Sequence, residues 1–376
     1  MLVPSKLEKD IVYSLMFHEY EEFLKISSNS SVDLEKVVSI ISSNRIEHFV
    51  LNKINSKFKI NELSANFFDQ LEICYLKKTI PTLRIIEKIF LLSDKLQKNN
   101  LDHVFLKGIA LYNHKKKYMR SMRDIDILVN PKDLIRVVSL AKSLDFKFKN
   151  INFEQSDSFI TSSLFYDLPP MVDSSGVVLE IHFRITTGNT ICPLKENIFK
   201  SKRLIKVHGK NVFIPCPNSL FNHLVYHASK KGNFDVGLSA LVDLIQLYEE
   251  IDKNNVLRIS ESIELRKITE LFFELIDFRK NKKIILSENA EKLKEILILP
   301  SINSKITEIL VQDSFLKMFK KIKNTLFVSK THLQKEFGIN KNLPMFFYLL
   351  KRWKRLTITV STSLFFYFKE FKICIY

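Results

Sequence analysis

Residues 104–129 have the sequence VFLKGIALYNHKKKYMRSMRDIDILV, which contains the two patterns on which the fold prediction depends. The first is a short apolar run, Val104–Leu106, that ends at a glycine, Gly108. The second is the run 124–129, in which acidic and apolar side chains alternate before an apolar end. Alternation with a period of two predicts a β-strand, and a glycine after an apolar run predicts a turn. We therefore predict two strands joined by a turn, a possible helix start and a basic loop over 114–123.

The sequence on the C-terminal side of these strands continues the mixed pattern. Pro131 can occupy the first turn of a helix, because its missing N–H is not needed there. Further candidate strands are 146–148, 177–183 and 212–214, of which VVLEIHF at 177–183 alternates most clearly. Residues 101–215 are therefore expected to form an α plus β core.

Helical spacing of apolar residues dominates both flanks of this core. The whole chain contains only 7 glycines in 376 residues, which also favours helix. Asp33 is placed to cap the start of a helix, and Pro81 is expected to interrupt a later one, which resumes at Thr82. We predict an N-terminal helical region over 1–100 and a C-terminal helical region with a basic tail over 216–376.

Composition and charge limit the classes of protein that need considering. With 46% apolar and 26% charged residues the chain resembles an ordinary folded protein, which argues against disorder and coiled coil. The net charge is +17, but residues 315–376 carry 13 Lys and Arg against Glu336 and Glu370, so +11 lies in that tail. Biased codon usage could produce the same positive charge, so nucleic-acid binding is possible but not favoured. The cluster 351–355, with Trp353, could contact RNA or a membrane surface, or form a solvated helix end.

The location of the protein is expected to be cytoplasmic. Its four cysteines include no CxxC pair that would suggest zinc or redox chemistry. The N-terminus has acidic residues where a signal peptide would be apolar. The longest uncharged stretch of concern, 356–368, is shorter than the about 20 residues that span a bilayer, so no transmembrane segment is expected.

Asp124 and Asp126 are the first candidates for chemistry. In a strand, residues i and i+2 point to the same face, so these carboxylates can converge on one cation or a close pair. Like charges at this spacing are costly unless something positive lies between them. The alternative is an exposed strand edge with two solvated acids.

Two further features make a phosphate site plausible beside these acids. Lys107 and Gly108 fall at a strand-to-helix turn, where backbone N–H groups favour phosphate, and the following basic loop, with Arg120 and Arg123, could reach phosphate oxygens. Glu180 stands in the middle of an apolar strand, where an acid is rarely buried without a partner. Three carboxylates in one pocket suit two Mg²⁺ ions and thus phosphoryl or nucleotidyl transfer.

The stretch LKGIALYNHKKKYMRSMRDIDILVNPKDLIRVVSLAKSLDFKF, residues 106–148, resembles the nucleotidyltransferase-like family of the DNA polymerase β-like superfamily. The later LEIHFRI, 179–185, is similar to that family's acid-x-His-aromatic-Arg strand. The segment 218–247 is similar to its downstream helical part, in which a His and an Asp-Leu pair recur. The matching motifs extend over about 104–247.

This resemblance implies an α+β fold with a small mixed β-sheet backed by helices and flanked by helical regions. It implies that Asp124, Asp126 and Glu180 are the catalytic and metal-binding acids, with Mg²⁺ or Mn²⁺ as the cofactor. The implied phosphate-binding residues are Lys107, Gly108 and Arg120, to which the residues themselves add Arg123 and Arg184. His182 and His227 are candidates for a supporting role around these groups. The superfamily's usual Gly-Ser turn is Lys-Gly here, which changes the grip on the phosphates.

The function that these features predict is transfer of a nucleoside monophosphate from an NTP to an acceptor hydroxyl, with release of pyrophosphate. The acceptor could be a protein, a small metabolite or a saccharide precursor. One alternative is a nucleotide-binding or protein-interaction module with little turnover on the same fold. A glycosyltransferase with a DxD motif is less favoured, because residues 1–100 lack its expected βα pattern. His223 and His227 have a metal-binding spacing but no evident third ligand, and Asp243 is expected to anchor a helix or pair with a base.

Overall fold

The computed structural model describes residues 6–17, 32–57, 65–112, 118–149, 168–185, 192–231, 234, 236–281 and 283–298. The basic cluster 351–355, the uncharged stretch 356–368 and residues 114–117 of the basic loop lie outside these ranges. Within them, the predicted N-cap is confirmed, because the Asp33 carboxylate accepts hydrogen bonds from the N–H groups of Glu35 and Lys36. The structure has the helices α1 (Lys6–Phe17), α3 (Leu34–Ser43), α4 (Glu47–Lys57), α5 (Ala65–Lys98), α6 (Leu134–Lys142), α8 (Pro193–Lys200), α9 (Pro217–Tyr226), α10 (Leu238–Leu247), α11 (Lys253–Ser262), α12 (Arg266–Lys280) and α13 (Glu288–Ile298).

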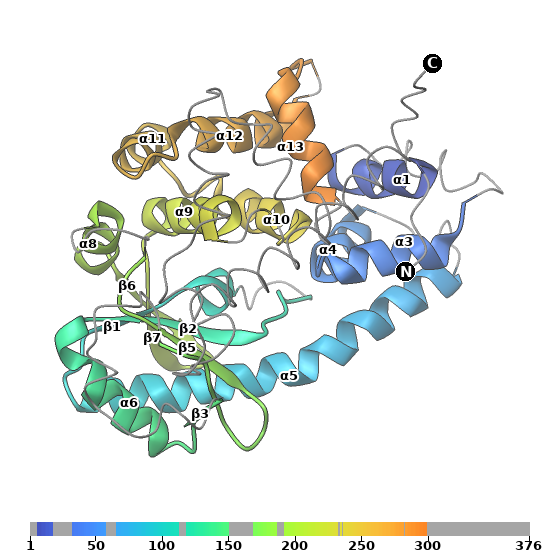
Figure 1. The fold of residues 1–376 in the computed structure, drawn as a ribbon. Helices are drawn as coiled ribbons and strands as arrows, with labels where there is room; N and C mark the ends of the chain where they lie inside the picture. Colours follow the sequence, from blue (N-terminus) through green and yellow to red (C-terminus); the bar gives the residue numbers. More distant parts are fainter. Residues whose placement is uncertain are drawn as a thin grey trace, which may run out of the picture.

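A mixed sheet of five strands lies in the middle of the molecule (Figure 1). Its order is β1-β2-β5-β4-β3, in which β2 and β5 are parallel and the other pairs are antiparallel. The strands are β1 (His103–Phe105), β2 (Asp124–Val129), β3 (Lys147–Phe148), β4 (Met171–Val172) and β5 (Val178–His182). The predicted α+β class with a small mixed sheet is confirmed.

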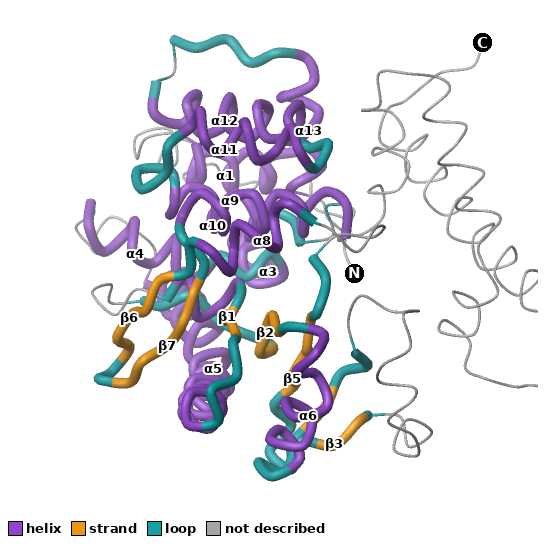
Figure 2. The backbone as a smooth tube through the Cα atoms, turned by 90° about the vertical axis from the view of Figure 1, so that its left-hand side faces the viewer, coloured by secondary structure: helices purple, strands orange, loops and turns teal. Residues whose placement is uncertain are grey.

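The two central strands separate apolar from polar side chains. Ile125, Ile127, Leu179 and Ile181 are all buried and alternate with the acids of the same strands. In Figures 1 and 2 the sheet lies between α5 and α6 on one side and α9 and α10 on the other. The apolar face stabilises the sheet by removing these side chains from water, and the opposite face is left to carry the acids.

Helix α5 differs from the sequence prediction, because it runs through Pro81 without a break for 34 residues. Proline removes one backbone hydrogen bond and normally kinks or ends a helix. Here the buried residues Tyr75, Ile85, Ile86 and Ile89 keep both halves of α5 packed against the core. The tertiary contacts therefore outweigh the local cost of the proline.

Two smaller elements also differ from the prediction. The segment after Lys107 forms a five-residue 3₁₀ helix, η2 (Lys107–Leu111), and a second short one, η3 (Pro131–Asp133), precedes α6. The predicted strand 212–214 is one half of a hairpin, β6 (Arg203–Val207) and β7 (Lys210–Ile214), whose first strand alternation alone did not identify. His208 and Gly209 both have positive φ at its turn, as a tight hairpin requires. Among the described residues, no helix has the length and apolarity needed to cross a bilayer.

Candidate active site

Strand β2 presents Asp124 and Asp126 on the face opposite its buried isoleucines. Asp124 stands at the start of the strand and is half-buried, whereas Asp126 is only 3% exposed. A carboxylate so deeply buried requires charged or hydrogen-bonding partners.

Strand β5 brings Glu180 beside Asp126, since the parallel pairing makes these two residues register partners. His182, two residues further, accompanies Glu180 on the same face, and its Nε2 lies 2.8 Å from Oδ1 of Asp126 and 3.6 Å from Oε2 of Glu180. One possible ligand atom from each of Asp126, Glu180 and His182 lies within 4.8 Å of the other two. The structure thus brings together Asp126 and Glu180, which are 54 residues apart, and adds a histidine that the sequence suggested only as a supporting residue.

Lys107 approaches the same carboxylate from the end of β1. Its Nζ lies 2.6 Å from Oδ1 of Asp126, with both side chains largely buried. The backbone of Lys107 has a φ of 47°, a left-handed conformation that is uncommon for residues other than glycine. This turn aims the ammonium group at Asp126, and Asp126 therefore accepts charge-assisted hydrogen bonds from a lysine and interacts with a histidine.

Gly108 has a packing role at this turn. A Cβ atom at this position would lie 2.7 Å from both Cγ and Sδ of Met122, which is itself buried. A side chain at position 108 would therefore require the buried Met122 side chain to shift. The phosphate contact expected of Gly108 stays a prediction.

The two aspartates have opposite pKa shifts. Burial alone would raise the pKa of Asp126, but the nearby charges and hydrogen bonds of Lys107 and His182 outweigh it and hold the pKa well below its ordinary value. Burial raises the pKa of Asp124 to about 6, and the negative charge of Asp126 adds to that shift. The cluster thus carries one strongly ionised acid and one whose charge is costly without a cation.

Arg120 is directed toward the C-terminal helices. Its Nε and Nη2 donate to the two carboxylate oxygens of Asp243 in α10, at 2.5 and 2.8 Å. The expectation that Asp243 pairs with a base is thereby confirmed. Because this bidentate contact engages the guanidinium, the phosphate-binding role of Arg120 stays a prediction.

The other two predicted phosphate-binding arginines line two different cavities. Arg184 follows β5 and lines a small cavity, called here the His182 cavity, together with Lys107, His182, His223 and His227. Arg123 precedes β2 and lines a second cavity. The His223 and His227 rings lie 6.5 Å apart, but in the described part of the chain the only group with three possible metal ligands is Asp126, Glu180 and His182.

This donor set fits a divalent cation. Carboxylate oxygens are the ligands that Mg²⁺ and Mn²⁺ prefer, and Asp126 and Glu180 supply them here. Burial raises the pKa of Asp124, and the charges of Asp126 and Glu180 add to the shift, so a cation bound nearby would favour the ionised form of this acid. Asp126 and Glu180 would hold the ion, with Asp124 adjacent on the same strand face, and His182 could join them only if its Nε2 gave up the contact with Asp126.

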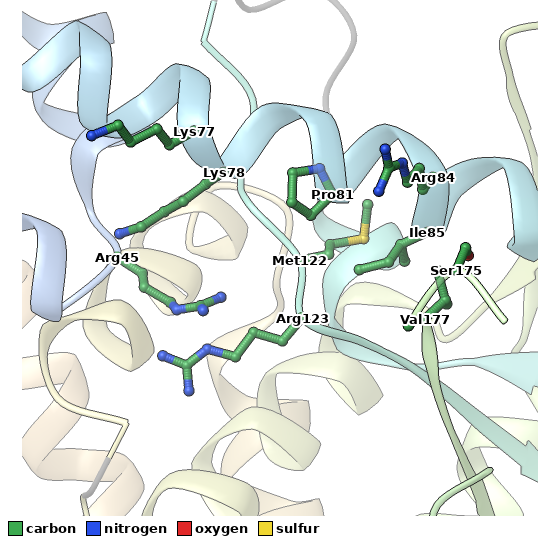
Figure 3. Close-up of a pocket in the computed structure, with 11 residues that line it drawn as sticks. Arg45, Lys77, Lys78, Pro81, Arg84, Ile85, Met122, Arg123, Ser175 and Val177 are labelled. Atoms are coloured by element: carbon green, nitrogen blue, oxygen red, sulfur yellow. The ribbon is translucent and has the colours of Figure 1, made fainter. Parts of the chain in front are cut away.

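The second cavity has a volume of about 330 Å³ and is called here the basic pocket (Figure 3). Five cationic residues line it: Arg45, Lys77, Lys78, Arg84 and Arg123. Three of them lie on α5 and Arg45 lies in the turn between α3 and α4, and no sequence pattern identified these four residues. A possible signal was the spacing of Lys77 and Arg84, two turns apart on one face of α5.

Residues 30–277 match the family described as "Uncharacterised nucleotidyltransferase". The chain belongs to this family. The matched range includes every residue of the candidate site, and the general class indicated for the protein is therefore a nucleotidyltransferase.

No curated protein matches the chain. Among solved structures, the crystal structure of an antigenic nucleotidyltransferase-like protein from Paracoccidioides brasiliensis is similar at 14% sequence identity. That similarity covers 54% of this chain and 94% of the other, with a TM-score of 0.33.

Proposed function

We propose that this nucleotidyltransferase family member transfers a nucleoside monophosphate from an NTP to the hydroxyl of an acceptor and releases pyrophosphate. The observation that carries the proposal is the pairing of Asp126 with Glu180 on adjacent parallel strands, with Asp124 and His182 on the same face. The acceptor could be a protein, a small metabolite or a saccharide precursor.

The acids would hold Mg²⁺ or Mn²⁺ between them. When bound, such ions neutralise triphosphate charge and favour ionisation of an attacking hydroxyl. Asp126 is held in one orientation by Lys107 and His182, so its free oxygen is preorganised for a ligand. Glu180, whose side chain is 28% exposed, can accept the proton that the acceptor hydroxyl loses.

In this reaction the acceptor oxygen forms a bond to the α-phosphorus, and the bond between that phosphorus and the β-phosphate bridging oxygen breaks. Pyrophosphate leaves with the electron pair of the broken bond. Lys107 and Arg184 would supply positive charge for the phosphates from beside the acids, since the His182 cavity that they line has a volume of only about 10 Å³ and does not itself hold a phosphate. Arg120 acts on the acids through its charge, since it stabilises the ionised form of Asp124.

A second candidate function is nucleotide binding with little turnover. The contact of Lys107 with Asp126 favours this alternative, because an ammonium group already neutralises the acid that a metal ion would need. A nucleotide could then bind without the charge arrangement that the transfer step requires.

Isothermal titration calorimetry with a non-hydrolysable NTP and Mg²⁺, followed by assays of pyrophosphate release with candidate acceptors, separates these functions. We expect Glu180→Gln to lose Mg²⁺-dependent NTP binding by at least tenfold. Asp94→Asn, which removes one exposed carboxylate of α5, is the matched control and should bind as wild type does. Equal Mg²⁺–NTP affinity of Glu180→Gln and wild type would refute the site, and binding without pyrophosphate release would favour the binding module.

A further inference from the structure

We propose that the basic pocket binds a phosphate group carried by the acceptor substrate. The inference rests on the proposed function in that it requires a second substrate. The inference goes beyond the proposed function in two ways: it names a chemical property of the second substrate, and it places that substrate in a pocket separate from the carboxylates.

The positive charge of the basic pocket is poorly compensated by the protein. Lys78 forms an ion pair with Glu47. Among the residues that the structure describes, Arg45, Lys77, Arg84 and Arg123 form no ion pair. Burial and the charge of Arg123 lower the pKa of Arg45 to about 10, although Glu47 and Asp124 oppose that shift. Cations gathered in this way repel one another, and an anion in the pocket would relieve the repulsion.

The cations come from three separate parts of the fold. Figure 3 shows Arg45 and Arg123 directed toward one another below α5, which contributes Lys77, Lys78 and Arg84. Arg45 has a φ of 55° at the turn between α3 and α4, so the chain accepts an uncommon backbone conformation there. The guanidinium groups of Arg45 and Arg123 can together donate several hydrogen bonds to the oxygens of one phosphate, and the cations of α5 add positive charge around them.

The position of the pocket assigns it to the acceptor. Its lining residues Met122, Arg123 and Val177 directly precede β2 and β5, whereas the His182 cavity lies where β5 ends. The acids of β2 and β5 therefore lie between the two cavities along the strands. The basic pocket lies at the Asp124 end of these acids, on the side away from Lys107 and Arg184, so a hydroxyl of a molecule held there would be directed toward Asp124 and the acids beyond.

The pocket has room for a phosphate and part of the molecule that carries it. A volume of about 330 Å³ lies at the lower end of the range for small-molecule sites. Pro81, Ile85, Met122 and Val177 add apolar surface beside the cations, which suits the uncharged part of a small phosphorylated molecule.

The test uses the full chain and inorganic pyrophosphate as the probe, with EDTA present so that no metal site contributes. The main variant is Lys77→Ala/Arg84→Ala, because both side chains are exposed on α5 and alanine preserves the helix. Arg45→Gln is a second, independent variant. The matched control is Lys132→Ala/Arg258→Ala, which removes the same charge from exposed positions elsewhere.

We expect wild type and the control to bind pyrophosphate equally by calorimetry, and the Lys77/Arg84 variant and Arg45→Gln to bind it at least tenfold more weakly. In a second arm with Mg²⁺ and a non-hydrolysable NTP, the pocket variants should bind as wild type does. Pyrophosphate affinity that is unchanged in the pocket variants would overturn the proposal. Loss of NTP affinity in the second arm would also overturn it, since the pocket would then hold the NTP phosphates. Glu180→Gln should keep its metal-free pyrophosphate affinity, so failure of the carboxylate site is separable from failure of the pocket.

Discussion

Asp126 has two roles, because it is a candidate metal ligand and also a buried charge that affects the stability of the core. It is buried, register-paired with Glu180, and bonded to Lys107 and His182. A buried carboxylate with one partner removed is costly, because the remaining charge keeps little of the solvation that it had in water. The ammonium group of Lys107 is therefore expected to stabilise the protein whenever no metal ion is bound.

Replacement of Lys107 tests this role. We expect Lys107→Met to lower the free energy of unfolding by about 2 to 4 kcal/mol in EDTA, measured by urea denaturation. Millimolar Mg²⁺ or Mn²⁺ should restore part of the loss, because the ion can supply the missing positive charge. Lys98→Met, at an exposed ion pair of α5, should change the free energy by less than about 0.5 kcal/mol. If the metal ion stabilises Lys107→Met no more than wild type, Asp126 is not a ligand.

The raised pKa of Asp124 predicts a pH dependence of stability. A group whose folded-state pKa is raised from about 3.9 to about 6 favours the folded state while protonated, and this contribution is lost as the pH rises through that window. Asp124→Asn removes the contribution of this group to the pH dependence of stability. The difference in free energy of unfolding between the variant and wild type, measured in EDTA, should therefore shift in favour of the variant from pH 4 to pH 7. A difference in free energy of unfolding that is constant with pH would show that the pKa of Asp124 is not raised in the folded protein.

At the scale of single elements, the turn after β1 depends on close packing more than on phosphate geometry. We expect Gly108→Ala to cost about 1 to 3 kcal/mol, since the new methyl group would overlap Met122 in a buried setting. In a Met122→Ala background the same substitution should cost less, because the obstructing atoms are gone. Denaturant unfolding of the four proteins forms a double-mutant cycle that measures this coupling. Additive effects would mean that another contact excludes the side chain.

The elements that the sequence could predict are those whose pattern is local. The alternation in β2 and β5 located both strands and placed the acids opposite the isoleucines, and Asp33 was correctly expected to cap a helix. The break predicted at Pro81 was wrong, because long-range packing of α5 outweighs the lost hydrogen bond. The pairing of Asp126 with Glu180 could only be inferred by resemblance, since the register of two strands 54 residues apart has no local signal. The basic pocket was missed for the same reason, as Arg45 and Arg84 meet Arg123 only through tertiary structure.

At the scale of the whole molecule, Arg120 connects the sheet region to the C-terminal helices. Burial alone would lower the pKa of Arg120, but Asp243 outweighs it and raises the pKa, so the guanidinium is charged across the working pH range. The same guanidinium also lowers the energy of the ionised Asp124. The packing of α10 and the charge of the acidic cluster are thus linked through one side chain.

Loss of the ion pair between Arg120 and Asp243 should lower the stability of the protein and change the charge of the acidic cluster. We expect Asp243→Asn to lower the free energy of unfolding by about 3 kcal/mol, because it leaves a buried guanidinium without its counterion. Arg120→Met/Asp243→Leu removes both charges and should be more stable than Asp243→Asn, since no buried charge then lacks a partner. Arg266→Met/Glu270→Leu, at a half-exposed pair of α12, is the control and should stay within about 1 kcal/mol of wild type. If the double variant at 120 and 243 were less stable than Asp243→Asn, the pair would contribute through its geometry and not through mutual neutralisation. Metal titration of the double variant completes the test: loss of the Arg120 charge should raise the pKa of Asp124 further and shift the onset of cation binding to higher pH.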